Sequence, residues 1–279
     1  MISGRSLIYS VGFIVILGSV TFGLDAFDAI KQWRQNYGDL NSIEVQCVRT
    51  VVKAEPNDHP LARNLPPLTE ISIIRKDKMF RSTAFLSWLS GKTISTEASY
   101  DGLTRRFYTK ELKEGTIDEQ TPDPTWQGYK FSYIDEYVGS IFVPEFERFA
   151  KTGNFEIVSD SKQIKGFDCI GYRLMFKEEI VFEIWFAKDK GMLPILYHNP
   201  GPDSERYEIL EVAQENGTWY PKKARQSFTN NDAYFEFQLD INKFVLDPTT
   251  DASTFSLDFP SGTEVYDERI RESYEVGVP

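Results

Sequence analysis

The sequence predicts a mainly β protein of the α+β class, built on one large curled antiparallel sheet that forms an open half-barrel, with helices covering its concave face. Three observations support this prediction. Apolar and polar residues alternate through most of the chain, which is the period of a half-buried strand. Turn signals such as Asp101-Gly102 and Asn216-Gly217 separate the alternating segments. No pattern of strands alternating with crossover helices is present, so an antiparallel sheet is expected.

The N-terminal residues have the layout of a secretory signal. A basic residue, Arg5, precedes an uncharged apolar run that ends at Gly23. We therefore expect residues 1–23 to be a signal peptide and residues 24–279 to form one exported domain, a length that can bury one substantial core. The alternative is an uncleaved run that tethers the domain to the membrane as an N-terminal helix.

Helical spacing marks two segments of the chain. Apolar residues recur at intervals of three and four over 27–37, with Asp25 as an N-cap and Gly38 as a stop signal. The second segment covers 133–151 and is expected to bend at Pro144. These two helices are the elements that we expect to cover the concave face of the sheet.

Strand-like alternation fills most of the remaining sequence. Polar, proline-containing segments at 56–68 and 115–128 interrupt it and are expected to be loops. The Asn216-Gly217 step is the strongest hairpin signal in the chain. The segments with strand periodicity are 43–48, 71–85, 93–100, 103–109, 170–176, 180–186, 193–198, 207–212, 219–228 and 235–242.

The composition argues against several kinds of partner. The chain has 42 acidic and 31 basic residues and a formal net charge of -11. Binding to nucleic acid or to anionic lipid surfaces needs clustered Lys and Arg, and no long basic run is present. We therefore expect no nucleic-acid partner, and we expect membrane contact only through export or through another protein.

No catalytic site and no metal or cofactor site is predicted, so we expect that the protein is not an enzyme. Of the two histidines, His59 lies beside Pro60 in an expected loop and His198 ends an expected strand beside Asn199-Pro200, and for both a solvated side chain is the simpler interpretation. Carboxylate pairs such as Glu178-Glu179 arise by chance in so acidic a chain. The nucleophile elbow, the phosphate-binding glycine loop and metal-ligand spacings of Cys and His are all missing from the sequence. An unrecognised hydrolase is the remaining alternative.

Cys47 and Cys169 are the two cysteines of the chain. In an oxidising compartment such a pair is a candidate disulfide. Cys47 also falls on the apolar side of its strand, where a buried free thiol is equally natural. Both interpretations are compatible with the sequence.

The chain is rich in aromatic residues, with 21 Phe, 14 Tyr and 5 Trp. One interpretation assigns the apolar strand faces entirely to the core. The other holds that a strongly curved sheet leaves an apolar cavity that can hold an acyl chain. The candidate cavity-lining residues are Phe182, Ile184, Phe235, Phe237 and Leu239.

Several stretches, in their order along the chain, resemble the LolA/LolB-like superfamily of periplasmic lipoprotein carriers and its relatives among outer-membrane lipoprotein-sorting proteins. These stretches are the signal with the opening helix to Gly38, then 98–109, 167–174, 184–194, 216–221 and 255–263. The resemblance implies a curled antiparallel sheet closed by helices, with an apolar interior that shelters lipoprotein acyl chains in the family. The loops at 56–68 and 115–128 are longer than those of the carriers.

The sequence and the resemblance together predict a periplasmic module that binds a lipid or a lipoprotein acyl chain in an apolar cavity, including the role of a lipoprotein carrier. The alternative is an envelope protein-interaction or sensor module with the same fold and a filled core. A continuous apolar cavity inside the sheet favours binding, whereas solid packing favours the alternative.

Overall fold

The computed structural model describes residues 26–37, 42–57, 59, 62–63, 65–77, 79–119, 154–176, 178–201, 204–230 and 232–277. The expected signal peptide, the expected bent helix over 133–151 and the later part of the expected loop over 115–128 lie outside these residues.

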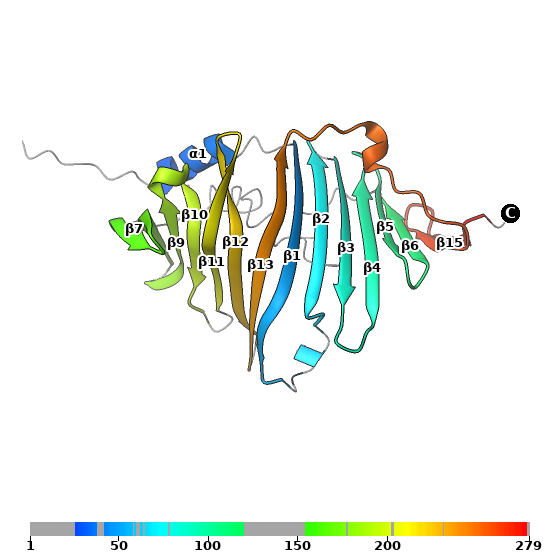
Figure 1. The fold of residues 1–279 in the computed structure, drawn as a ribbon, viewed down its shortest axis with the longest axis horizontal. Coiled ribbons are helices and arrows are strands. Elements are labelled where there is room, and N and C mark those ends of the chain that lie inside the picture. Colours follow the sequence, from blue (N-terminus) through cyan, green and yellow to red (C-terminus); the bar gives the residue numbers. More distant parts are fainter. Residues whose placement is uncertain are drawn as a thin grey trace, which may run out of the picture.

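Fifteen strands of the described chain form one sheet that does not close on itself (Figure 1). The order across the sheet is β15-β14-β6-β5-β4-β3-β2-β1-β13-β12-β11-β10-β9-β8-β7. The elements are α1 (Ala26–Tyr37), β1 (Ser42–Glu55), β2 (Leu68–Lys76), β3 (Met79–Ser87), β4 (Thr93–Tyr100), β5 (Arg105–Thr109), β6 (Glu114–Asp118), β7 (Asn154–Ile164), β8 (Phe167–Phe176), β9 (Glu179–Ala187), η1 (Lys188–Lys190), β10 (Leu193–Asn199), β11 (Glu205–Glu215), β12 (Thr218–Asn230), β13 (Ala233–Leu246), η2 (Ala252–Phe255), β14 (Glu264–Asp267) and β15 (Glu272–Glu275).

Two runs of sequential strands make up the sheet. Strands β1 to β6 lie on one side and β7 to β13 on the other, and the antiparallel pairing of β1 with β13 joins the two runs in the centre (Figure 1). Each run grows by short connections between neighbouring strands, as expected for an antiparallel sheet. The prediction of a large open sheet is therefore confirmed.

The prediction of a purely antiparallel sheet is wrong at one position. Strand β14 returns after η2 and pairs parallel to β6, which makes the sheet mixed. A parallel pair needs a long connection, and here that connection is the rest of the chain between the two strands. In addition, the expected connection at 115–128 begins with a strand, because β6 covers Glu114–Asp118.

The prediction that helices cover the concave face is not supported. In the described part of the chain α1 is the one α-helix of more than two residues, and it packs at the β7 end of the sheet (Figure 1). Its buried residues are Ala26, Ala29 and Trp33. Among the described residues, no helix is long and apolar enough to cross a membrane.

Local turn chemistry agrees with the sequence patterns. Asn216 and Gly217 both have positive φ, at 47° and 85°, and they join β11 to β12. This is the backbone conformation that the two-residue hairpin turn requires and that Asn-Gly adopts readily. The expected single strand over 71–85 is instead the hairpin of β2 and β3, with Asp77 at a φ of 54° in its turn.

One face of the sheet, here called the inner face, carries most of the buried side chains. On β13, Phe235, Phe237 and Leu239 are 0–2% exposed, while Glu236 and Gln238 between them are half-buried. This alternation confirms the expected buried and wet sides of that strand. Residues of the inner face of β8 and β9 are equally buried, including Tyr172 and Phe186.

The opposite face of the sheet is here called the outer face. The segment that follows β13 covers this face beside β3 and β5. Phe255 and Leu257 of that segment are buried, and Arg81 Nη1 of β3 donates a hydrogen bond to the carbonyl oxygen of Ser256 at 3.1 Å. The ring of Phe259 lies 6.1 Å from that of Tyr108 on β5. Towards the middle of the sheet the outer-face residues Glu70, Thr83 and Phe85 are exposed.

Cys47 and Cys169 are both free and buried, so the disulfide interpretation is wrong and the buried-thiol interpretation holds. Burial raises the pKa of the Cys47 thiol to about 12 and that of Cys169 to about 11, because a thiolate is poorly solvated there.

We expect neither thiol to react with iodoacetamide at pH 8 in the folded protein, and both to react in concentrated urea. Peptide mapping by mass spectrometry measures this directly. Above about pH 8.5 the unfolded state loses thiol protons that the folded state keeps. The stability that the buried neutral thiols contribute is therefore present at neutral pH and falls as pH rises. Rapid labelling of both cysteines without urea would contradict the prediction.

Candidate functional site

The five residues predicted from the sequence as cavity lining all lie on the inner face of the sheet. Their side chains are 0–3% exposed, and they belong to two separate apolar clusters. The larger cluster contains Phe182, Ile184 and Leu239, and the smaller one contains Phe235 and Phe237.

Aromatic side chains pack around Phe182 and Phe186 of the larger cluster. The ring of Phe182 lies 5.5 Å from that of Tyr197 and 6.0 Å from that of Phe155, and the latter pair is edge-to-face. Further along the same strand, Phe186 packs 5.9 Å from the ring of Trp33 on α1. Aromatic rings at these centroid distances pack against one another.

The smaller cluster, here called the end cluster, lies near the C-terminal end of β1, where this central strand leads into the proline-rich loop. The ring of Phe228 lies 5.1 Å from Phe235 and 5.7 Å from Phe237. The guanidinium of Arg49 lies over Phe237, 5.1 Å from the ring centroid. The partly buried residues Val51, Ala54, Ala62 and Leu65 pack against this cluster.

Several hydrogen-bonded polar side chains lie on the inner face between the larger cluster and the end cluster. Tyr207 donates through its hydroxyl to Glu205 Oε1 at 2.5 Å, and Gln226 Nε2 donates to the same oxygen at 3.0 Å. Gln226 is 3% exposed and is the direct neighbour of Phe237 across the β12–β13 pair. Buried polar groups of this kind are stable when they are hydrogen-bonded to one another.

A hollow of about 380 Å³, here called the end hollow, opens beside the end cluster. It is lined by Val51, Ala62, Arg63, Leu65, Pro67, Trp88, Leu89 and Ser90. Val51, Ala62 and Leu65 therefore contact the end cluster on one side and line the hollow on the other. None of the five predicted residues lines it directly.

The loop between β1 and β2 is held in place by backbone hydrogen bonds. Val51 N donates to the carbonyl oxygen of Pro67 at 2.9 Å, and His59 N donates to that of Pro56 at 3.0 Å. The loop returns beside the strand that it left, so its apolar residues form a wall of the end hollow. The sequence predicts a loop here but not a site. The signal for the site is the presence of the apolar residues Ala62 and Leu65 among the prolines of the loop.

The lining of the end hollow is apolar with a basic rim. Leu89 is 95% exposed, which is unusual for so large an apolar side chain, and Trp88 beside it is partly buried. Arg63 is exposed at the rim, and Lys92 Nζ lies 5.4 Å from the ring of Trp88. Among the described residues that line the hollow, none is acidic. This chemistry is complementary to an apolar chain that ends in an anionic group.

The described residues contain no group of three or more His, Cys, Asp or Glu side chains that could hold a metal ion. His59 packs edge-on against Phe235, with ring centroids 6.2 Å apart.

A scan against protein-family models and a search of curated proteins found no match to this sequence. Among solved structures, a DUF1329 family protein from Desulfovibrio piger aligns with a TM-score of 0.53 and 12% identity, over 83% of this chain and 95% of that one. A LolA superfamily protein from Nitrosomonas europaea covers 84% of this chain and 99% of its own, with 11% identity and a TM-score of 0.46.

The protein MucB aligns over 84% of this chain and 63% of its own, with 11% identity and a TM-score of 0.30. At these identities the comparisons concern the fold alone. The likeness to the DUF1329 family protein shows the fold of this chain, which is built on a large open sheet of the kind that the sequence resemblance implies.

Proposed function

We propose that this protein is a periplasmic binding module for an amphiphile with an acyl chain, such as a lipid or the acylated end of a lipoprotein, and that it has no catalytic role. The end hollow is the observation that carries the proposal. Its volume of about 380 Å³ falls in the range of small-molecule sites. The LolA-like fold supports a binding or carrier role.

Burial of the acyl chain against Val51, Leu65 and Trp88 supplies the driving force of this proposal. Each methylene removed from water contributes about 0.8 kcal/mol, so a short run of the chain offsets the loss of translational freedom on binding. Arg63 then pairs with the carboxylate or phosphate at the polar end of the amphiphile. The proposed site therefore differs from the inner-face cavity expected from the sequence.

The test is a titration with 11-(dansylamino)undecanoic acid, whose fluorescence rises when its chain leaves water. We expect saturable binding in the micromolar range, and Leu65→Asp should weaken it at least 10-fold because it places a carboxylate in the hollow. Leu112→Asp is the matched control, since Leu112 is 58% exposed and does not line the hollow. That variant should bind like the unchanged protein.

The role of Arg63 is tested separately with two competitors. Arg63→Gln should weaken the affinity for dodecanoic acid about 5- to 10-fold, and it should leave the affinity for dodecanol unchanged, when both are derived from competition and corrected for the affinity of each protein for the probe, whose carboxylate also pairs with Arg63. Native mass spectrometry of protein purified from an envelope fraction should show a co-purifying lipid. Absence of any lipid together with no fluorescence response would contradict the proposed function.

A filled core favours the second candidate, an envelope protein-interaction or sensor module. The five inner-face residues are 0–3% exposed and line neither of the hollows described in this protein. Strands β7 and β15 leave sheet edges to which a partner could add a strand. The titration separates the candidates, because this second module requires no response to the amphiphile.

A further inference from the structure

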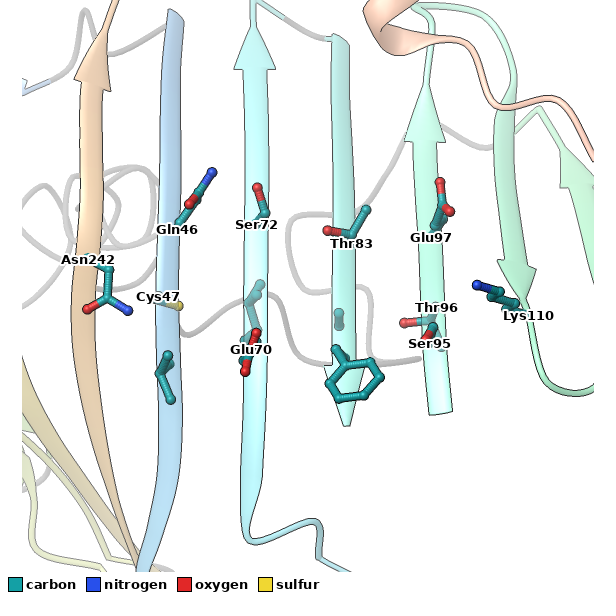
Figure 2. A pocket seen from close by; sticks show the side chains of 14 residues that line it. Gln46, Cys47, Glu70, Ser72, Thr83, Ser95, Thr96, Glu97, Lys110 and Asn242 are labelled. Carbon is teal, nitrogen blue, oxygen red and sulfur yellow. The ribbon is translucent and has the colours of Figure 1, made fainter. Parts of the chain in front are cut away.

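A second hollow, of about 390 Å³, lies on the outer face at the centre of the sheet (Figure 2). We call it the outer trough. Its floor is the backbone of Cys47, Ile71, Ala84 and Thr96, which are direct neighbours across β1, β2, β3 and β4. The side chains of these four residues are 1–7% exposed and belong to the buried inner side of their strands.

Two rows of side chains flank this floor. One row consists of Gln46, Ser72, Thr83 and Glu97, which Figure 2 shows side by side on successive strands. The other row consists of Val48, Glu70, Phe85 and Ser95. Asn242 on β13 and Lys110 after β5 lie at the two ends of the trough (Figure 2).

Strand geometry sets the shape of the trough. The two rows are two residues apart along each strand, which is about 7 Å, and four strands at their usual spacing extend over about 14 Å. Ser72, Thr83 and Ser95 are small, so the middle of the trough stays open, while longer side chains such as Gln46 and Glu70 raise its sides. The result is an elongated trough that runs across the strands.

The lining is rich in hydrogen-bonding groups of mixed kind. It contains two amides, three hydroxyls of Ser72, Thr83 and Ser95, two carboxylates and an ammonium group. Glu97 is held by Arg81 at 2.8 Å. Glu70 is exposed, and no hydrogen bond or ion pair of its side chain is formed with the described residues.

Glu70 and Phe85 are direct neighbours across the β2–β3 pair, and Phe85 is 39% exposed. A carboxylate beside an exposed aromatic ring suits a pyranose. The ring of the sugar packs its C–H face on the aromatic face, and two adjacent hydroxyls donate to the carboxylate oxygens. The two carboxylates disfavour an anionic ligand, and the many polar groups disfavour an acyl chain.

We propose that the outer trough binds a neutral oligosaccharide of two or three linked pyranose units. The chain of sugars lies across β1 to β4, with one ring on Phe85 and its hydroxyls donating to Glu70. The hydroxyls of Ser72 and Thr83 and the amide of Gln46, in the opposite row, contact the other side of the sugar. This site is on the opposite face from the inner-face clusters, and it does not depend on the binding of an amphiphile.

The test uses cellotriose, maltotriose and N,N′,N″-triacetylchitotriose as probes, with isothermal titration and saturation-transfer difference NMR. At least one probe should bind with a dissociation constant below about 1 mM. Phe85→Ala and Glu70→Gln should each weaken binding about 10-fold, and Ser72→Tyr should abolish it by filling the trough. Circular dichroism and thermal melting confirm that each variant is folded.

Matched controls are available on the last two strands of the sheet. Tyr266→Ala removes an aromatic residue that is 43% exposed on β14, and Glu272→Gln neutralises an exposed carboxylate on β15. Neither residue lines the trough, so both variants should bind the sugar unchanged. Binding of no probe, or equal losses in the controls, would overturn the proposal. Loss of sugar binding in Leu65→Asp would also overturn it, because it would move the sugar to the end hollow.

Discussion

Replacing Asp118 with alanine is expected to lower the free energy of unfolding by about 3–5 kcal/mol. Asp118 on β6 and Arg105 on β5 are direct neighbours, and both side chains are under 10% exposed. Arg105 donates from Nε and Nη2 to Asp118 Oδ2, at 2.8 and 2.5 Å. Removing the carboxylate takes both of these hydrogen bonds and the facing negative charge away from a buried guanidinium, which is the costly case.

Urea unfolding followed by circular dichroism measures this loss. The double variant Arg105→Met with Asp118→Leu should lose much less, because it removes both charges and keeps apolar volume. Glu211→Ala is the surface control: Glu211 is 57% exposed and 4.0 Å from Lys223, so its loss should stay below about 1 kcal/mol. A loss below about 1 kcal/mol in the free energy of unfolding of Asp118→Ala would contradict the prediction.

Replacing Trp33 with alanine is also expected to cost about 3–5 kcal/mol. Trp33 is 0% exposed on α1, and its ring packs 5.9 Å from that of Phe186, which is equally buried. The substitution leaves a void in the larger cluster that its neighbours can fill only in part. Trp33→Phe should cost less, because part of the ring contact remains.

Gln32→Ala is the matched control on the same helix, since Gln32 is exposed. Its effect on urea unfolding should lie within about 0.5 kcal/mol. The end hollow is lined by other residues, so the folded Trp33→Ala variant should bind the dansylated fatty acid with unchanged affinity. A Trp33→Ala variant as stable as Gln32→Ala would show that α1 contributes little to the fold.

Much of the sheet was predictable because its signals are local. The alternation of Phe235, Phe237 and Leu239 with polar residues gave their burial correctly, since a strand places successive side chains on opposite faces. The turn was equally predictable from the Asn216-Gly217 step, and the positive φ values of both residues confirm it. The parallel pairing of β14 with β6 was not, because it joins segments far apart in the chain and has no local signature.

The role of the five predicted residues also depended on more than their pattern. Alternation places Phe182 and Phe235 on the inner face, but it does not say whether a side chain or a ligand fills the space in front of them. In the structure Tyr197 and Phe155 pack on Phe182, and Phe228 packs on Phe235. The two hollows lined by described residues lie instead at the end of β1 and on the outer face.

By itself, the sequence determined the β class of the protein, the position of the Asn216-Gly217 hairpin and which side of a strand such as β13 is apolar, because these follow from contacts between residues close in the chain. The tertiary structure alone decided where the hollows lie. Gln46, Ser72, Thr83 and Glu97 meet in one row only because four strands pair in one register. A shift of one residue in any of these strands would turn its side chains to the other face, so both hollows exist only once the whole sheet has formed.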